Sequence, residues 1–150
     1  MSDQTLPPLR DLQPPRRLKG FRVAPPGSPM PAHAESPVFP LEAADLWRAW
    51  MDVAARQPRT TLGMKDERTF SSLHVQRSSL FHFPDLVRAE VVPLGHGRSS
   101  LVLDSRARFG GWDFGVNRRR VTRWLRDLQR RAAEEQRASD QSPGLAPPAA

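Results

Sequence analysis

The segment Ser99–Leu128, SSLVLDSRARFGGWDFGVNRRRVTRWLRDL, decides the fold of this chain. It begins with an apolar run that alternates as a β-strand does over Ser99–Ser105, passes the glycine pair Gly110-Gly111, and continues as an arginine-rich amphipathic helix. Such a corner must be built accurately, because the strand and the helix leave it in fixed directions. The corner is therefore the first place to look for a functional site.

The closing helix is predicted to begin near Asn117, a residue type that accepts hydrogen bonds from the free amides of a first turn. Its apolar residues recur at helical spacing and form one stripe: Val121, Trp124, Leu125, Leu128 and Ala132. We expect this stripe to pack against a sheet and the arginines to face outward.

A second helix is expected over residues 41–57. Its apolar stripe includes Leu46, Trp47 and Trp50, and Pro58 ends it. Four strand-like runs follow, at residues 60–65, 69–76, 86–92 and 99–105. The connections between the runs are too short for crossover helices, so the strands should be antiparallel. The fold prediction is α+β: a two-layer α-β-β-β-β-α domain, with a four-stranded antiparallel sheet packed by two helices.

Composition divides the chain into three parts. Ten of the sixteen prolines lie in the first forty residues, so residues 1–39 are predicted to form a proline-rich flexible arm. Residues 40–137 are the predicted α+β domain, and the small polar residues 138–150 are a predicted disordered tail.

Charge and cysteine content exclude several classes of site. The net charge is +7, and residues 116–150 carry eight basic and four acidic groups, so much of the excess lies on the last helix. The chain has no cysteine, which excludes disulfides and thiolate metal sites. Its first residues, MSDQTLPPLR, do not resemble a signal peptide, and no apolar run approaches the roughly 20 residues that span a bilayer. A cytoplasmic location is expected, with peripheral attachment to a membrane assembly left open.

The corner gathers side chains that suit an anion. An anion can bind where a helix N-terminus presents free amides and arginines lie near. The candidate site residues are Arg106, Arg108, Asp113, Asn117, Arg120, Asp85 and Trp112. The alternative interpretation is structural: Asp113 and Asn117 satisfy the helix start, and Arg106 pairs with Asp85 or Asp113.

Two motifs carry a family resemblance: FPD at Phe83–Asp85, and SRARFGGWDFGVNRRRVTRWL at Ser105–Leu125. Together they resemble a bacterial family catalogued as domain of unknown function 1499, over about residues 41–130. The resemblance implies the outline of the domain and no activity, because the family has none established.

Three functional hypotheses follow. The first is a small non-catalytic binding or accessory module, a subunit of a larger membrane-associated assembly, which meets a protein partner through the N-terminal arm or the Trp112 corner. The second is a protein or enzyme that binds a small phosphate or carboxylate at the corner. The third is weak nucleic-acid binding through the basic last helix. The four histidines lack ligand spacing, so no catalytic residue, metal site or cofactor is predicted.

Overall fold

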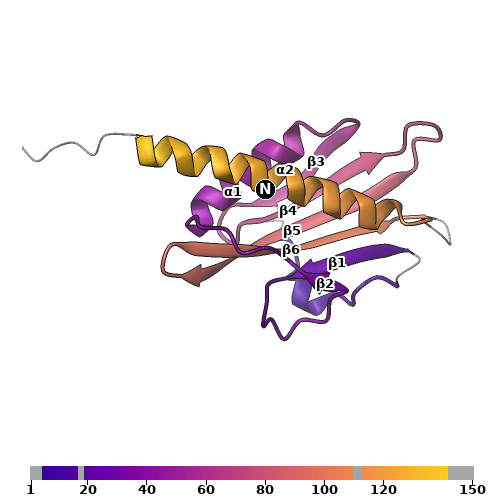
Figure 1. The fold of residues 1–150 in the computed structure, drawn as a ribbon. Coiled ribbons are helices and arrows are strands. Elements are labelled where there is room, and N and C mark those ends of the chain that lie inside the picture. Colours follow the sequence, from indigo (N-terminus) through magenta and orange to yellow (C-terminus); the bar gives the residue numbers. More distant parts are fainter. Residues whose placement is uncertain (1–4, 17–18, 110–112, 142–150) are drawn as a thin grey trace, which may run out of the picture.

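The computed structural model describes residues 5–16, 19–109 and 113–141. It has an α+β fold, with two helices on one face of a single mixed sheet (Figure 1). The elements are the 3₁₀ turn η1 (Leu9–Asp11), strands β1 (Gly20–Ala24) and β2 (Ala34–Glu35), helix α1 (Ala43–Ala55), strands β3 (Thr60–Asp66), β4 (Ser71–Arg77), β5 (Pro84–Gly95) and β6 (Arg98–Ala107), and helix α2 (Val116–Gln141).

The sheet has six strands in the order β2-β1-β6-β5-β4-β3. All neighbours are antiparallel except β1 and β2, which pair in parallel. The prediction of four antiparallel strands is therefore corrected. The β-strands expected from residue 60 onward are present, and the two additional strands come from residues 1–39, which were assigned to the arm.

Strand β1 was not predicted, because it is short and lies between the proline pairs Pro14-Pro15 and Pro25-Pro26. It pairs with β6 in the register Phe21↔Ser105 and Val23↔Leu103. The signal was present, because Phe21 and Val23 alternate with Arg22 and Ala24. Prolines on either side of a strand limit its length, but they do not prevent it from forming.

The helices bury the main core against one face of the sheet, as the two apolar stripes predicted. Trp50 of α1 and Trp124 of α2 are fully buried, with ring centroids 5.7 Å apart. The Trp50 indole donates to Ser72 Oγ of β4 at 2.8 Å. Each buried Val or Leu of the stripes contributes roughly 1.5–3 kcal/mol, which is enough to hold α2 in place.

Residues 5–16 lie across the opposite face of the sheet, and we call this segment the strap. Leu6 and Leu9 of the strap are buried, and Leu9 packs with Ala24 and Val102 in a second, smaller apolar cluster. The Leu9 N–H donates to Glu90 Oε2 of β5 at 2.9 Å. Part of the proline-rich N-terminal segment thus packs on the sheet.

Candidate functional site

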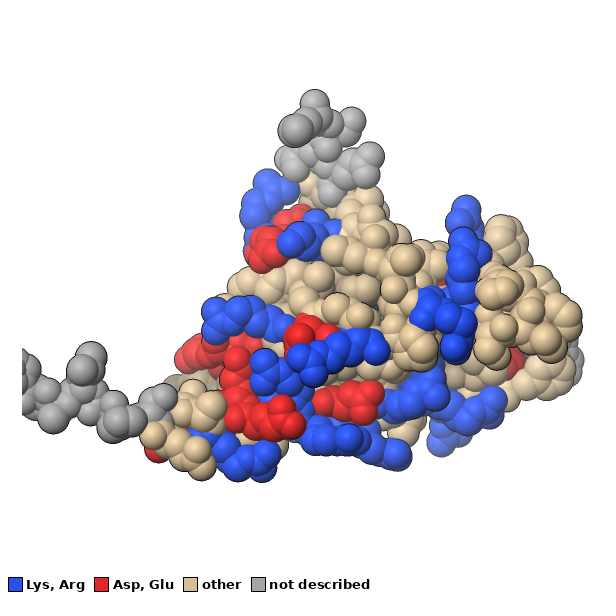
Figure 2. All heavy atoms as spheres, turned by 90° about the horizontal axis from the view of Figure 1, so that it is seen from above, with Lys and Arg blue, Asp and Glu red and all other residues tan. Residues whose placement is uncertain are grey.

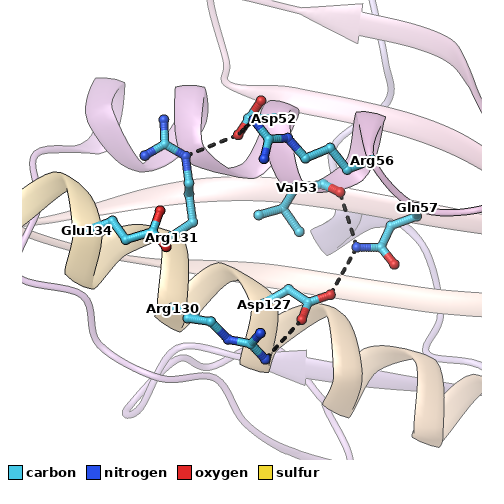
Figure 3. A pocket seen from close by; sticks show the side chains of 8 residues that line it. All are labelled: Asp52, Val53, Arg56, Gln57, Asp127, Arg130, Arg131 and Glu134. Atoms are coloured by element: carbon cyan, nitrogen blue, oxygen red, sulfur yellow. Dashed lines mark hydrogen bonds and ion pairs between the residues drawn. The ribbon is translucent and has the colours of Figure 1, made fainter.

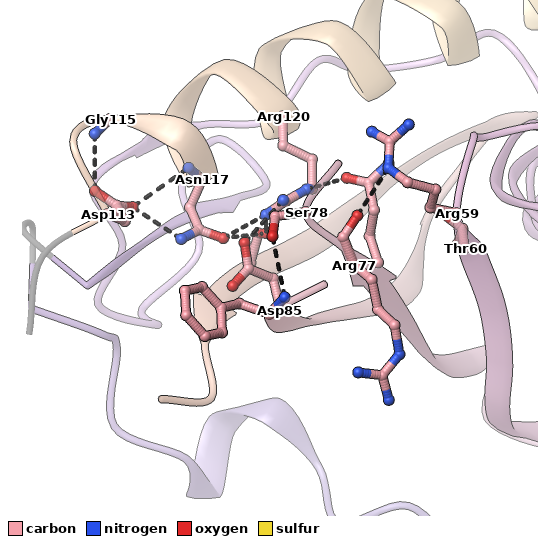
Figure 4. Close-up of polar contacts among 12 residues, drawn as sticks. Arg59, Thr60, Arg77, Ser78, Asp85, Asp113, Gly115, Asn117 and Arg120 are labelled. Atoms are coloured by element: carbon pink, nitrogen blue, oxygen red, sulfur yellow. Dashed lines mark hydrogen bonds and ion pairs between the residues drawn. The ribbon is translucent and has the colours of Figure 1, made fainter. Parts of the chain in front are cut away.

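The corner between β6 and α2 is closed by Asp113. Its Oδ1 accepts from the Gly115 N–H at 2.8 Å, and its Oδ2 accepts from the Asn117 N–H at 3.3 Å and from Asn117 Nδ2 at 2.8 Å (Figure 4). Asp113 therefore supplies the cap that the sequence analysis assigned to Asn117. Asn117 lies in the first turn of α2 and its side chain is fully buried. Trp112, with Gly110 and Gly111, lies outside the described residues.

Arg120 is the centre of a buried network that joins α2 to three strands. Its Nη2 forms an ion pair with Asp85 Oδ2 at 2.8 Å, and its Nε donates to Gln76 Oε1. Its Nη1 donates to Asn117 Oδ1 at 2.7 Å and to Ser105 Oγ at 3.1 Å. Burial lowers the pKa of the Arg120 guanidinium, and Asp85 opposes that shift.

This network is already satisfied by the protein itself. Each of the three Arg120 nitrogens has an acceptor, and Ser105 Oγ donates to Asn117 Oδ1 at 2.7 Å. Buried polar groups that are fully paired tie elements together and leave no donor for a ligand. The geometry at the helix start thus favours the structural interpretation of Asp85, Asn117 and Arg120.

Arg106 and Arg108 do not contact the network around Arg120. Arg106 lies on the opposite face of the sheet, where its Nε and Nη2 donate to the two carboxylate oxygens of Asp104, each at 2.8 Å. Arg108 is exposed, and its guanidinium lies over the Phe109 ring, 5.3 Å from the centroid. The expected pairing of Arg106 with Asp85 or Asp113 is wrong, because successive residues of a strand face opposite sides.

An aromatic cluster that was not predicted lies at the end of the sheet where β6 leads into α2. Two loops present it: residues 78–83 between β4 and β5, and the connection from β6 to α2 (Figure 1). The two loops are adjacent, because Asp85 pairs with Ala107 and the Arg108 N–H donates to Pro84 O at 3.2 Å. We call this surface the aromatic end; its exposed members are Leu80, Phe81, Phe83, Phe109 and Phe114. Single exposed phenylalanines are common, whereas five large apolar side chains at one end are a signal.

The loop of residues 78–83 is held in place by its own contacts. The Ser78 N–H donates to Phe83 O, and the Phe83 N–H returns to Ser78 Oγ, both at 3.0 Å. The Phe81 and Phe83 rings stack with centroids 5.5 Å apart. The part of the surface on residues 78–83 is therefore held in place by the protein itself.

Arginines surround the aromatic end, and each is attached to one of its loops. Arg77 Nη1 donates to His82 O at 3.0 Å, Arg119 Nη1 donates to Phe114 O at 3.1 Å, and Arg108 stacks on its neighbouring phenylalanine. Among the described residues of the two loops the only acid is Asp113, which is buried in its cap. The aromatic end therefore combines apolar tips with positive charge.

A groove of about 270 Å³ between α1 and α2 has a different character (Figure 3). Its three acids and three arginines balance. Arg131 pairs with Asp52 across the groove at 3.0 Å, and Arg130 pairs with Asp127 within α2 at 3.5 Å. Figure 2 shows the same mixture of acidic and basic side chains over the helices. Interleaved charge on α2 does not favour the nucleic-acid hypothesis, which needs a continuous basic surface.

In the described parts of the chain, no group of three or more histidine, aspartate or glutamate side chains is placed to hold a metal ion. Within the same residues, neither helix has the length and apolar character needed to cross a membrane.

Comparisons with known proteins give a fold and a family. The crystal structure of Ara h 8.0201 is similar, with a TM-score of 0.50 over 67% of this chain and 95% of that one. Its sequence is 10% identical, so the likeness concerns the fold alone. No curated protein matches the chain. Residues 15–128, a range that includes β1 and the whole sheet, match the family model described as protein of unknown function (DUF1499), and the chain belongs to this family.

Proposed function

We propose that this chain is a binding module that docks through its aromatic end on an anionic membrane surface. The observation that carries the proposal is the aromatic end itself: five exposed large apolar side chains on two adjacent loops, with arginines attached to those loops and no exposed acid among their described residues. The strap packs on the chain's own sheet, so the proposal rests on the aromatic end and not on the arm.

The energetics suit a peripheral contact. Burying one phenylalanine is worth roughly 1.5–3 kcal/mol, and each arginine near an anionic lipid surface adds about 1 kcal/mol. The loop of residues 78–83 is already held by the Ser78–Phe83 hydrogen bonds, so little entropy is lost when this loop makes contact. Phe81 at the loop tip and the stacked Phe83 beside it are the expected anchors.

Vesicle sedimentation tests the proposal. We expect the protein to sediment with vesicles of phosphatidylglycerol and phosphatidylcholine, and to remain in solution with phosphatidylcholine alone. The double variant Phe81→Ser, Phe83→Ser should lose most of the binding. Val38→Ser is the matched control: Val38 is also exposed, but its neighbour Phe39 pairs with Ser99, at the opposite end of β6.

Two results would contradict a membrane contact. One is vesicle binding that the double variant leaves unchanged. The other is no vesicle binding, together with a purified protein partner from the host whose affinity falls in the double variant and not in Val38→Ser. The second result would reassign the aromatic end to an acidic protein surface.

A further inference from the structure

A pocket of about 380 Å³ lies between the strap and the sheet face that the helices leave uncovered. Its walls are largely apolar, with Leu6, Pro7 and Leu12 from the strap and Met64, Leu73 and Leu86 from three strands. Three charged residues complete it: Arg88, Asp104 and Arg106. A pocket of this size, apolar with a few convergent polar groups, is typical of small-molecule sites.

The charged part of the pocket contains more guanidinium than carboxylate. Asp104 is 1% exposed and accepts from both Arg22 Nε, at 2.7 Å, and Arg106. Arg88 lies on the neighbouring strand β5, in the register Arg88↔Asp104. The nearby Glu90 accepts from the strap at Leu9. Three arginines thus share two carboxylates, one of which also holds the strap.

Two arginine donors on this face of the sheet are buried and have no acceptor among the described residues: Nε of Arg88, which lines the pocket, and Nη1 of Arg22, which does not. Arg22 is fully buried, and leaving a charged donor unpaired in such a place costs more than an ordinary hydrogen bond contributes. Burial also lowers the pKa of Arg88, while Glu90 and Asp104 oppose that shift. An anion in the pocket beside Arg88 would give its Nε an acceptor.

The arginines Arg22, Arg88 and Arg106 all donate hydrogen bonds to backbone carbonyls of the strap. Arg22 Nη2 donates to Leu12 O at 2.8 Å, Arg106 Nη2 donates to Gln13 O at 2.9 Å, and Arg88 Nη2 donates to Pro7 O. The arginines therefore connect the cover of the pocket to its floor. A ligand that adds an acceptor here would strengthen the same set of contacts.

We infer that this pocket binds a small amphiphilic carboxylate, whose apolar part lies among Leu6, Leu73 and Leu86 and whose carboxylate accepts from the unpaired Nε of Arg88. A carboxylate suits the site because guanidinium groups bind it in a planar, two-point geometry. It also fits better than a phosphate dianion, because the Asp104 carboxylate shares the site and repels additional negative charge. This inference is independent of the membrane contact.

Decanoate is the probe, used with the full chain below the concentration at which it forms micelles. We expect decanoate to raise the melting temperature and to bind measurably by calorimetry. Decanol, which has the same chain and no charge, should bind more weakly, and acetate, which has the charge and no chain, should not bind. Equal binding of decanol and decanoate would overturn the carboxylate assignment.

Two variants locate the site. Arg88→Met keeps the apolar stem and should weaken decanoate by about tenfold or more, with little effect on decanol. Arg98→Met is its control, since Arg98 is an exposed arginine at the start of β6 and does not line the pocket.

Leu73→Trp fills the pocket and should abolish binding of both probes. It also keeps the test decisive if Arg88→Met does not fold. Decanoate binding that survives Leu73→Trp in a folded protein would place the ligand elsewhere and overturn the inference. The aromatic-end double variant should bind decanoate normally.

Discussion

Two buried arginines, one on each face of the sheet, differ in how completely their donors are hydrogen-bonded. Arg120, on the buried side of α2, has an acceptor for each of its three nitrogens. Arg22, beneath the strap, is even more buried, and its Nη1 has no acceptor among the described residues. The Arg120 set of hydrogen bonds is complete, whereas the Arg22 set leaves one buried donor unpaired within that part of the chain.

The segments that cover the two faces also differ: one face is covered by helices and the other by a short irregular segment. Two helices seal one face over a core that includes Trp50, Trp124 and Leu128. The other face is covered by a twelve-residue strap over a cluster centred on Leu9. Regions with few buried apolar contacts open at a lower free energy than the core. The strap face is therefore the part of the molecule that is suited to admit a ligand.

Arg120→Met should produce the largest effect. It leaves the Asp85 carboxylate without its ion-pair partner, and it removes the link between α2 and three strands. Breaking such a buried pair costs about 3–5 kcal/mol of the free energy of unfolding. Urea denaturation of the variant measures it, and a loss below about 1 kcal/mol would show that the network is not a structural tie.

Arg22→Met is the matched change on the other face. Its expected cost is about 2 kcal/mol, because Asp104 keeps both hydrogen bonds from Arg106 and an unpaired donor is removed at the same time. A cost equal to that of Arg120→Met would abolish the contrast between the two faces.

The sequence predicted the helix face well and the strap face poorly. The apolar residues of the helices, such as Trp124 and Leu128, recur at helical spacing, and β3 to β6 alternate as strands do, so these elements were predictable from local pattern. The site residues were harder, because whether Arg106 meets Asp85 or Asp104 depends on which way each strand residue faces. Strap packing depends on Leu9 meeting β5 and β6, which are about eighty residues away in the chain. No local signal encodes a contact of that kind.

The pH dependence of stability should reveal one unpaired group on the helix face. His74 is 2% exposed beside Trp50, and burial lowers its pKa from 6.5 to about 4. Between these pH values the unfolded chain binds a proton that the folded chain excludes, so stability is full above pH 6.5 and falls as pH decreases. We expect the free energy of unfolding to be about 2 kcal/mol lower at pH 5 than at pH 8 from this residue.

His74→Phe, which keeps an aromatic ring against Trp50, separates His74 from the acidic groups. The variant should lose most of the change between pH 8 and pH 5. If the free energy of unfolding of the variant changes with pH as much as that of the wild type, the pH dependence belongs to the carboxylates.

Asp113→Ala tests the start of α2 with a smaller expected effect. The Gly115 and Asn117 amides would lose their acceptor, which costs about 1 kcal/mol for a typical cap. Gly115 has φ +78°, so Gly115→Val should cost about 1–2 kcal/mol through backbone strain instead. Thermal unfolding of both variants distinguishes the two causes, because added salt should reduce only the cost of Asp113→Ala.

The smallest effect belongs to the groove between the helices. Arg131 pairs with Asp52 at 3.0 Å, but both side chains are about one-third exposed, so water and salt screen the attraction. Arg131→Gln should therefore cost about 0.5 kcal/mol or less in urea denaturation, and that cost should vanish in high salt. A loss comparable to that of Arg120→Met would mean that paired charge at the surface stabilises this fold as much as paired charge in its interior. Burial would then not explain why the two faces of the sheet treat their arginines differently.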